Sequence, residues 1–154
     1  MPCTWERRSE AWRRRYSVQL VAEAATENEG KASALLDKGL AFVKAKGMDV
    51  ALAEFNNPKG KFIDGEFYLF VFSYNGECVA HGANQKMVGK NQIEMMDADG
   101  KPLIREFISI AKTKNKGWYD YKWSNPPTKK IQDKRSILAA IPGKDAVIGC
   151  GYYK

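Results

Sequence analysis

The chain has 154 residues, of which 44% are hydrophobic and 12% aromatic, so we expect one globular domain with a sizeable core and no intrinsic disorder. No run approaches the ~18 consecutive apolar residues of a membrane-spanning helix. The net charge of +7 makes a nucleic acid or an anionic surface worth weighing as a partner. Acidic residues are interspersed with the basic ones, however, which favours plain solubility and no nucleic-acid binding.

Residues 1–25 form an atypical N-terminal extension that is rich in Arg, Trp and Glu. It ends in Ala22-Glu23-Ala24-Ala25, which resembles the pattern before a signal-peptidase site, although the apolar segment of a secretory signal is missing. Three interpretations stay open: a signal remnant upstream of the mature domain, a segment added by cloning, or an extra helix. Such a helix would carry aromatic residues at helical spacing and could support a homodimer.

Two helices are predicted at the start of the remaining segment, residues 26–154, which we expect to be a single domain. Apolar residues at helical spacing, among them Leu36, Leu40 and Val43, predict a long helix over 26–46. A second, short helix fits 49–55. A strand over 67–73 follows, and the Asn75-Gly76 turn predicts a hairpin with a returning strand over 77–81.

The second half of the domain is predicted to hold one helix and three strands. After a long loop over 82–96, apolar spacing predicts a helix over 102–113 and strands over 117–123, 134–141 and 146–152. Helices before and inside a run of hairpin-linked strands indicate an α+β domain with a central antiparallel sheet of five to six strands. The residues expected in the core are Leu36, Leu40, Phe70, Phe107, Ile110 and Ile148.

The motifs of common enzymes are missing from the sequence. It contains no phosphate-binding loop, no GxSxG motif and no zinc-ligand spacing, so we expect no catalytic residue, no metal and no cofactor. A Cys78 and His81 pair is the one catalytic alternative, but an i, i+3 spacing on a strand places the two side chains on opposite faces. Cys78 and Cys150 are interpreted as buried free thiols, with a disulfide as the open alternative.

A small-molecule cavity is better supported, because aromatic residues and a few polar donors cluster around the predicted hairpin, the long loop and the next strand. Lys90 and a protonated His81 could both pair with a carboxylate. The candidate lining residues are Tyr68, Phe70, His81, Lys90, Trp118, Tyr119, Tyr121 and Trp123.

Several of these segments resemble the single Cache domain family. The resemblance rests first on the run over 67–72, the turn over 74–76, Val79-Ala80-His81-Gly82 and Val88-Gly89-Lys90-Asn91. It continues through the turn over 97–100 and the helix after it, the aromatic strand over 117–123, Pro126, Lys134 and the closing segment over 148–152, and it covers about residues 27–154. It implies a PAS-like fold with a long N-terminal helix and a central antiparallel sheet. It also implies that the segment holding His81, Lys90 and Asn91 bounds the ligand pocket, and that Tyr121 and Trp123 are the third-strand aromatics of the family.

The resemblance further implies the function. Cache domains are extracytoplasmic sensors of small organic acids, such as acetate, propionate, lactate or pyruvate, in chemoreceptors and histidine kinases. We therefore expect a non-catalytic, signal-transducing binding domain, with a membrane-bound histidine kinase or chemoreceptor as its partner. The ligand-binding residues expected are Tyr68, Phe70, His81, Lys90, Asn91, Trp118, Tyr121 and Trp123.

The cellular location and two other function classes stay open. Without a membrane-spanning segment or a transmitter, the chain looks like a stand-alone periplasmic version of the domain, or a cytoplasmic one if residues 1–25 are native and retained. The alternatives are an enzyme that uses Cys78 or His81, and a nucleic-acid or anionic-surface binder that uses the Arg-rich N-terminus.

Overall fold

The computed structural model describes residues 26–154, so the predictions for residues 1–25, including the homodimer through that segment, lie outside the described residues. Residues 26–46 are helical, and no helix in the described range is long and apolar enough to cross a bilayer. The other elements are α2 (Met48–Phe55), β1 (Ile63–Asp64), β2 (Phe67–Ser73), β3 (Cys78–His81), the short 3-10 helix η1 (Gln85–Met87), α3 (Ile104–Lys114), β4 (Lys116–Asn125), β5 (Lys130–Ala140) and β6 (Ala146–Tyr153).

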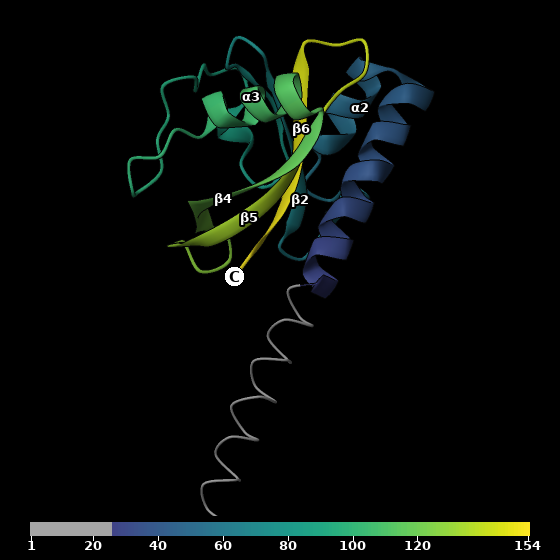
Figure 1. The fold of residues 1–154 in the computed structure, drawn as a ribbon. Helices are drawn as coiled ribbons and strands as arrows, with labels where there is room; N and C mark the ends of the chain where they lie inside the picture. The colour runs from purple at the N-terminus through teal and green to yellow at the C-terminus, as the bar shows by residue number, and fades with distance from the viewer. Residues whose placement is uncertain (1–25) are drawn as a thin grey trace, which may run out of the picture.

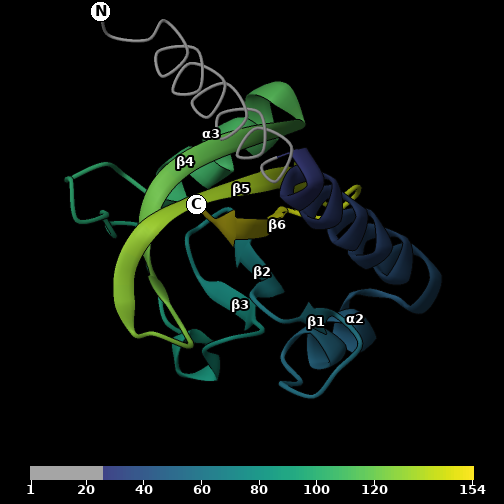
Figure 2. The ribbon, with the colours of Figure 1, turned by 90° about the horizontal axis from the view of Figure 1, so that it is seen from below.

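The strands form one six-stranded antiparallel sheet with the order β1-β2-β6-β5-β4, and β3 pairs with β2 (Figure 1). The predicted α+β class and antiparallel sheet are confirmed. β4 and β5 are longer than predicted, because their pairing runs from Lys116↔Ala139 to Asn125↔Lys130 and leaves only residues 126–129 for the turn. Seen from below, this hairpin curls toward the side on which β3 lies (Figure 2).

The long helix packs on one face of the sheet (Figure 1). Its buried residues recur at helical spacing, and a side chain at Gly39 would come within 2.6 Å of Leu69 Cδ1. Gly39 therefore sets the closest approach of helix and sheet. Leu40 packs against the same core but is only partly buried, so the prediction that it is fully buried is wrong. The buried residues of the helix are Ala32, Leu36, Gly39 and Val43.

The opposite face of the sheet is covered by α3 and the preceding loop. Phe107 and Ile110 of α3 are buried there, as predicted. Strand β2 serves both cores, because Leu69 and Val71 face the long helix, whereas the intervening aromatic residues face α3. The sheet thus separates two cores: most buried residues on the helix side are aliphatic, with the rings of Phe55 and Phe62 among them, whereas the α3 side is richer in rings.

Gly149 of β6 lies under the ring of Phe70, which is its partner across the β2–β6 pairing. A Cβ atom at this position would lie 2.7 Å from Leu138 Cδ2 and closer still to the Phe70 ring. The missing side chain therefore makes the space that the Phe70 ring occupies.

We predict that Gly149→Ala lowers the free energy of unfolding by about 1–3 kcal/mol, because it overpacks this contact. Gly30→Ala is the matched control: Gly30 is exposed on the helix and a Cβ there meets nothing within 4 Å, so the change should stabilise by about 0.5–1 kcal/mol. Urea unfolding of both variants measures this. Equal tolerance of the two substitutions would contradict the packing of Phe70 on Gly149.

Candidate functional site

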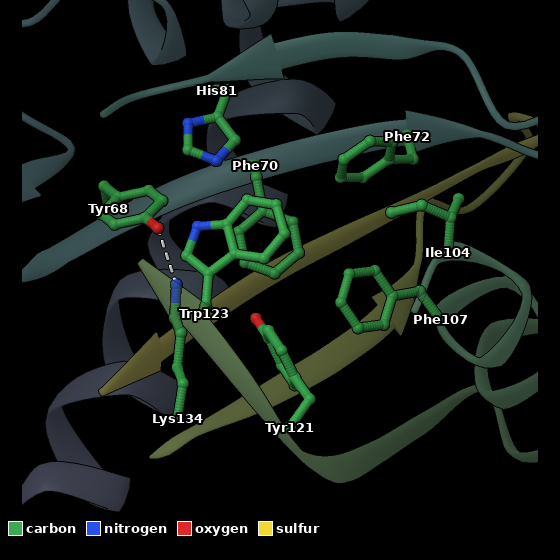
Figure 3. A pocket seen from close by; sticks show the side chains of 9 residues that line it. All are labelled: Tyr68, Phe70, Phe72, His81, Ile104, Phe107, Tyr121, Trp123 and Lys134. Carbon is green, nitrogen blue, oxygen red and sulfur yellow. Dashed lines mark hydrogen bonds between the residues drawn. The ribbon is translucent and has the colours of Figure 1, made fainter. Parts of the chain in front are cut away.

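A small cavity lies on the α3 side of the sheet, between the β2–β3 hairpin, the β4–β5 hairpin and α3 (Figure 3). Its walls are almost entirely aromatic or aliphatic. The volume open to the centre of a water molecule is about 10 Å³, which is room for about one water. The lining residues are Tyr68, Phe70, Phe72, His81, Ile104, Phe107, Tyr121, Trp123 and Lys134.

Among residues 26–154, Lys134 is the one lysine that lines this cavity. The residue is 1% exposed, and its Nζ donates a hydrogen bond of 2.7 Å to the hydroxyl of Tyr68 (Figure 3). The same Nζ lies 4.2 Å from the centroid of the Tyr68 ring and 5.0 Å from that of Tyr153. These contacts with aromatic faces partly offset the loss of hydration of a cation.

No carboxylate in residues 26–154 pairs with Lys134, although burying an unpaired charge is strongly unfavourable. Burial accordingly lowers the pKa of Lys134 to about 7. Among residues 26–154, the Lys134 ammonium thus lies beside an apolar cavity without a counter-charge.

The Tyr68 hydroxyl that accepts from Lys134 is one of several buried or half-buried hydroxyl groups that hydrogen-bond on β2, β4, β5 and β6. The Tyr68 and Tyr153 oxygens lie 3.4 Å apart, and the Tyr153 hydroxyl donates to the Ser124 carbonyl at 2.9 Å. The hydroxyl of Tyr121 lies 2.9 Å from Ser136 Oγ, its partner. Burial raises the pKa values of Tyr68 and Tyr121 well above the usual range, so both stay neutral donors or acceptors.

His81 was predicted to be protonated, but its surroundings favour the neutral imidazole. Burial and the nearby positive charge of Lys134 lower its pKa to about 3, so its imidazole is neutral at physiological pH. The expectation of a protonated His81 that pairs with a carboxylate is therefore wrong. His81 can offer a hydrogen bond, but not a charge.

The structure brings together five of the residues predicted for the pocket: Tyr68, Phe70, His81, Tyr121 and Trp123 line the cavity. Tyr119, which was also considered for the lining, packs beside the cavity, with its ring centroid 6.1 Å from that of Phe107.

Three predicted residues lie elsewhere. Lys90 and Asn91 are exposed on the loop. The Lys90 carbonyl accepts from Cys78 N–H, and the Asn91 side chain is used to hold the loop, because its Nδ2 donates to the Asn75 carbonyl. Trp118 packs against the helix-side core, with the Arg135 guanidinium 5.1 Å from its ring centroid.

Lys134 is the functional candidate that the sequence analysis missed. The feature that could have pointed to Lys134 is its cross-strand partner, because Tyr121 lies directly opposite it in the β4–β5 pairing. A lysine that shares a strand face with Ser136 and Leu138 and opposes a pocket tyrosine is unusual. Phe72, Ile104 and Phe107, which also line the cavity, were expected only as core or strand residues.

The prediction that Cys78 and His81 point to opposite faces of the sheet is also wrong, because both side chains lie on the α3 side. The β2–β3 register shifts between Val71 and Phe72, so Cys78, not Val79, pairs with Phe72 and faces the α3 side. Burial raises the pKa of the Cys78 thiol to about 11, and its Sγ contacts the Ala80 carbonyl. Such a thiol lacks the thiolate character of a nucleophile. Cys78 and Cys150 are both free.

We predict that Lys134→Met raises the melting temperature of the unliganded domain by about 3–8 °C at pH 6, because it removes an unpaired buried charge. The pKa of Lys134 is lower in the folded than in the unfolded chain, so the folded state bears this cost fully below about pH 7. The gain should shrink as the pH rises toward 10. A melting temperature that falls at pH 6 in calorimetric scans would contradict the unpaired charge.

The geometry can be compared with related proteins. MctS, a sensor histidine kinase of Rhizobium johnstonii, is 35% identical over 86 residues, which make up 56% of this chain and 18% of that protein. The chain therefore spans less than a fifth of the length of this curated relative.

Two solved structures share the fold. A methyl-accepting chemotaxis protein from Vibrio parahaemolyticus superimposes with a TM-score of 0.74 at 18% identity, over 88% of this chain and 95% of the other. A Cache chemosensory domain, described for carboxylic acid recognition, gives a TM-score of 0.66 at 20% identity, over 88% and 96% of the two chains.

The sequence model of the family described as Single Cache domain 2 matches residues 50–154, which is more than half of the chain. The match includes all six strands, α3 and every residue that lines the cavity. The chain therefore belongs to the Single Cache domain 2 family of sensor domains.

Proposed function

We propose that this chain is the ligand-binding domain of an extracytoplasmic sensor for small monocarboxylic acids, of the acetate, propionate, lactate or pyruvate class. The observation that carries the proposal is the buried ammonium of Lys134, which faces an apolar cavity and has no carboxylate partner among residues 26–154. The acid supplies the missing anion.

The chemistry of the cavity fits such a ligand at both ends. The carboxylate pairs with the Lys134 ammonium, and a charge-assisted hydrogen bond of this kind contributes about 1.5–3 kcal/mol. The rings of Phe70, Tyr121 and Trp123 surround the short carbon tail. The cavity has room for about one water, so it must widen on binding to admit even a small acid.

The receptor setting is part of the same proposal. One relative is a sensor histidine kinase, and a protein with the same fold is a methyl-accepting chemotaxis protein. Both support a role in which the bound acid alters the activity of a membrane receptor and the domain itself catalyses no reaction. The proposed location is extracytoplasmic, in the periplasm, as is common for members of this family.

We predict that acetate, propionate, lactate or pyruvate binds the protein and raises its melting temperature by mass action. Lys134→Met should weaken binding by at least about tenfold, because the carboxylate would lose its cation. Isothermal titration calorimetry measures both effects.

Lys90→Met is the matched control, since Lys90 is exposed on the loop and should leave the dissociation constant unchanged. If none of the four acids binds at millimolar concentration, the organic-acid function is wrong. If Lys90→Met abolishes binding and Lys134→Met does not, the acid binds somewhere other than the cavity.

A further inference from the structure

His81 is held in one tautomer. The backbone N–H of Asn84 donates a hydrogen bond of 2.9 Å to His81 Nδ1, and the backbone N–H of His81 itself donates to Asn56 Oδ1 at 2.9 Å. A backbone amide is always a donor, so Nδ1 must be the acceptor and must lack a proton. The one ring proton of the neutral imidazole therefore sits on Nε2.

The protonated nitrogen faces the cavity. Figure 3 shows the second ring nitrogen of His81 pointing toward Phe70 and Trp123, away from the backbone of its own strand. The residue is 3% exposed and lines the cavity, and its Nε2 has no hydrogen-bond partner among residues 26–154 but retains a little accessible surface. The cavity thus contains a neutral N–H donor without an acceptor.

This donor is not needed by the carboxylate of the ligand. The Lys134 ammonium has three N–H donors, of which one is used by Tyr68, so two remain for the two carboxylate oxygens. A ligand with a further oxygen next to its carboxylate would satisfy His81, whereas an alkanoate would leave the N–H unpaired in an apolar space. A site with an unpaired polar group discriminates strongly against the ligand that leaves it unpaired.

We propose, on the basis of the proposed acid-binding function, that His81 Nε2–H is a specificity-determining donor for the oxygen on C2 of the ligand. The site accordingly selects 2-oxo and 2-hydroxy acids over alkanoates of the same length. His81 acts as a neutral reader of this oxygen, while Lys134 holds the carboxylate.

The test compares pyruvate, lactate and propionate, which share three carbons, by calorimetry on the full chain. The wild type should bind pyruvate or lactate about tenfold more tightly than propionate. His81→Leu should remove this preference, so that the variant binds the three acids with affinities within about threefold of one another, and His81→Gln, which retains an N–H donor, should keep part of the preference.

Equal affinity of the wild type for the three acids would overturn the inference but leave the proposed function intact. An equal loss for all three acids in His81→Leu would overturn it as well, because His81 would then serve the carboxylate. No binding of any acid would overturn both.

A spectroscopic readout does not depend on the folding of a variant. His81 is the only histidine of the chain, so nitrogen-15 spectra of the imidazole report on it alone. We expect the Nε2–H tautomer, and an Nε2–H proton resonance that moves downfield with pyruvate but not with propionate. The opposite tautomer, or the same response to both acids, would contradict the inference.

Discussion

The site depends on a lysine ammonium that is buried without an anion. Its hydrogen bond to the Tyr68 hydroxyl and its contacts with aromatic faces hold the side chain in place, but they do not replace a counter-charge. The low pKa of Lys134 is the sign of this imbalance. A protein tolerates such a cost where binding a ligand repays it, and ligand-binding sites are commonly less stable than a fully apolar core would be.

The sheet makes this arrangement compatible with a stable fold, because one face packs against the long helix and the other holds the cavity. The face under the long helix packs a mostly aliphatic core, and the other face carries the cavity and the rings that line it. β5 connects the two: Lys134 faces the cavity, while the next residue, Arg135, forms a 2.8 Å ion pair with Glu29 of the long helix. The residue beside the buried cation is thus tied to the helix across the sheet.

Most of the architecture could be predicted from local signals, such as the apolar spacing of the helices and the Asn75-Gly76 turn. Lys134 could not be recognised in this way, because its burial depends on the pairing of β4 with β5 and on the curl of that hairpin. The prediction of which face Cys78 occupies was wrong for a similar reason, because the irregular register at Val79 has no signature in the sequence. Lys90 was misplaced because a loop without periodicity says nothing about which of its side chains turn inward.

The most direct test of the account is the titration of the Lys134 ammonium by NMR, on lysine-labelled protein, with the signal identified by its loss in Lys134→Met. The account predicts a pKa near 7 without ligand, and a rise of at least about one unit when the cavity is saturated with an acid that binds. A Lys134 that titrates near its ordinary value of 10.5 without ligand, or that is unmoved by the bound acid, would contradict it.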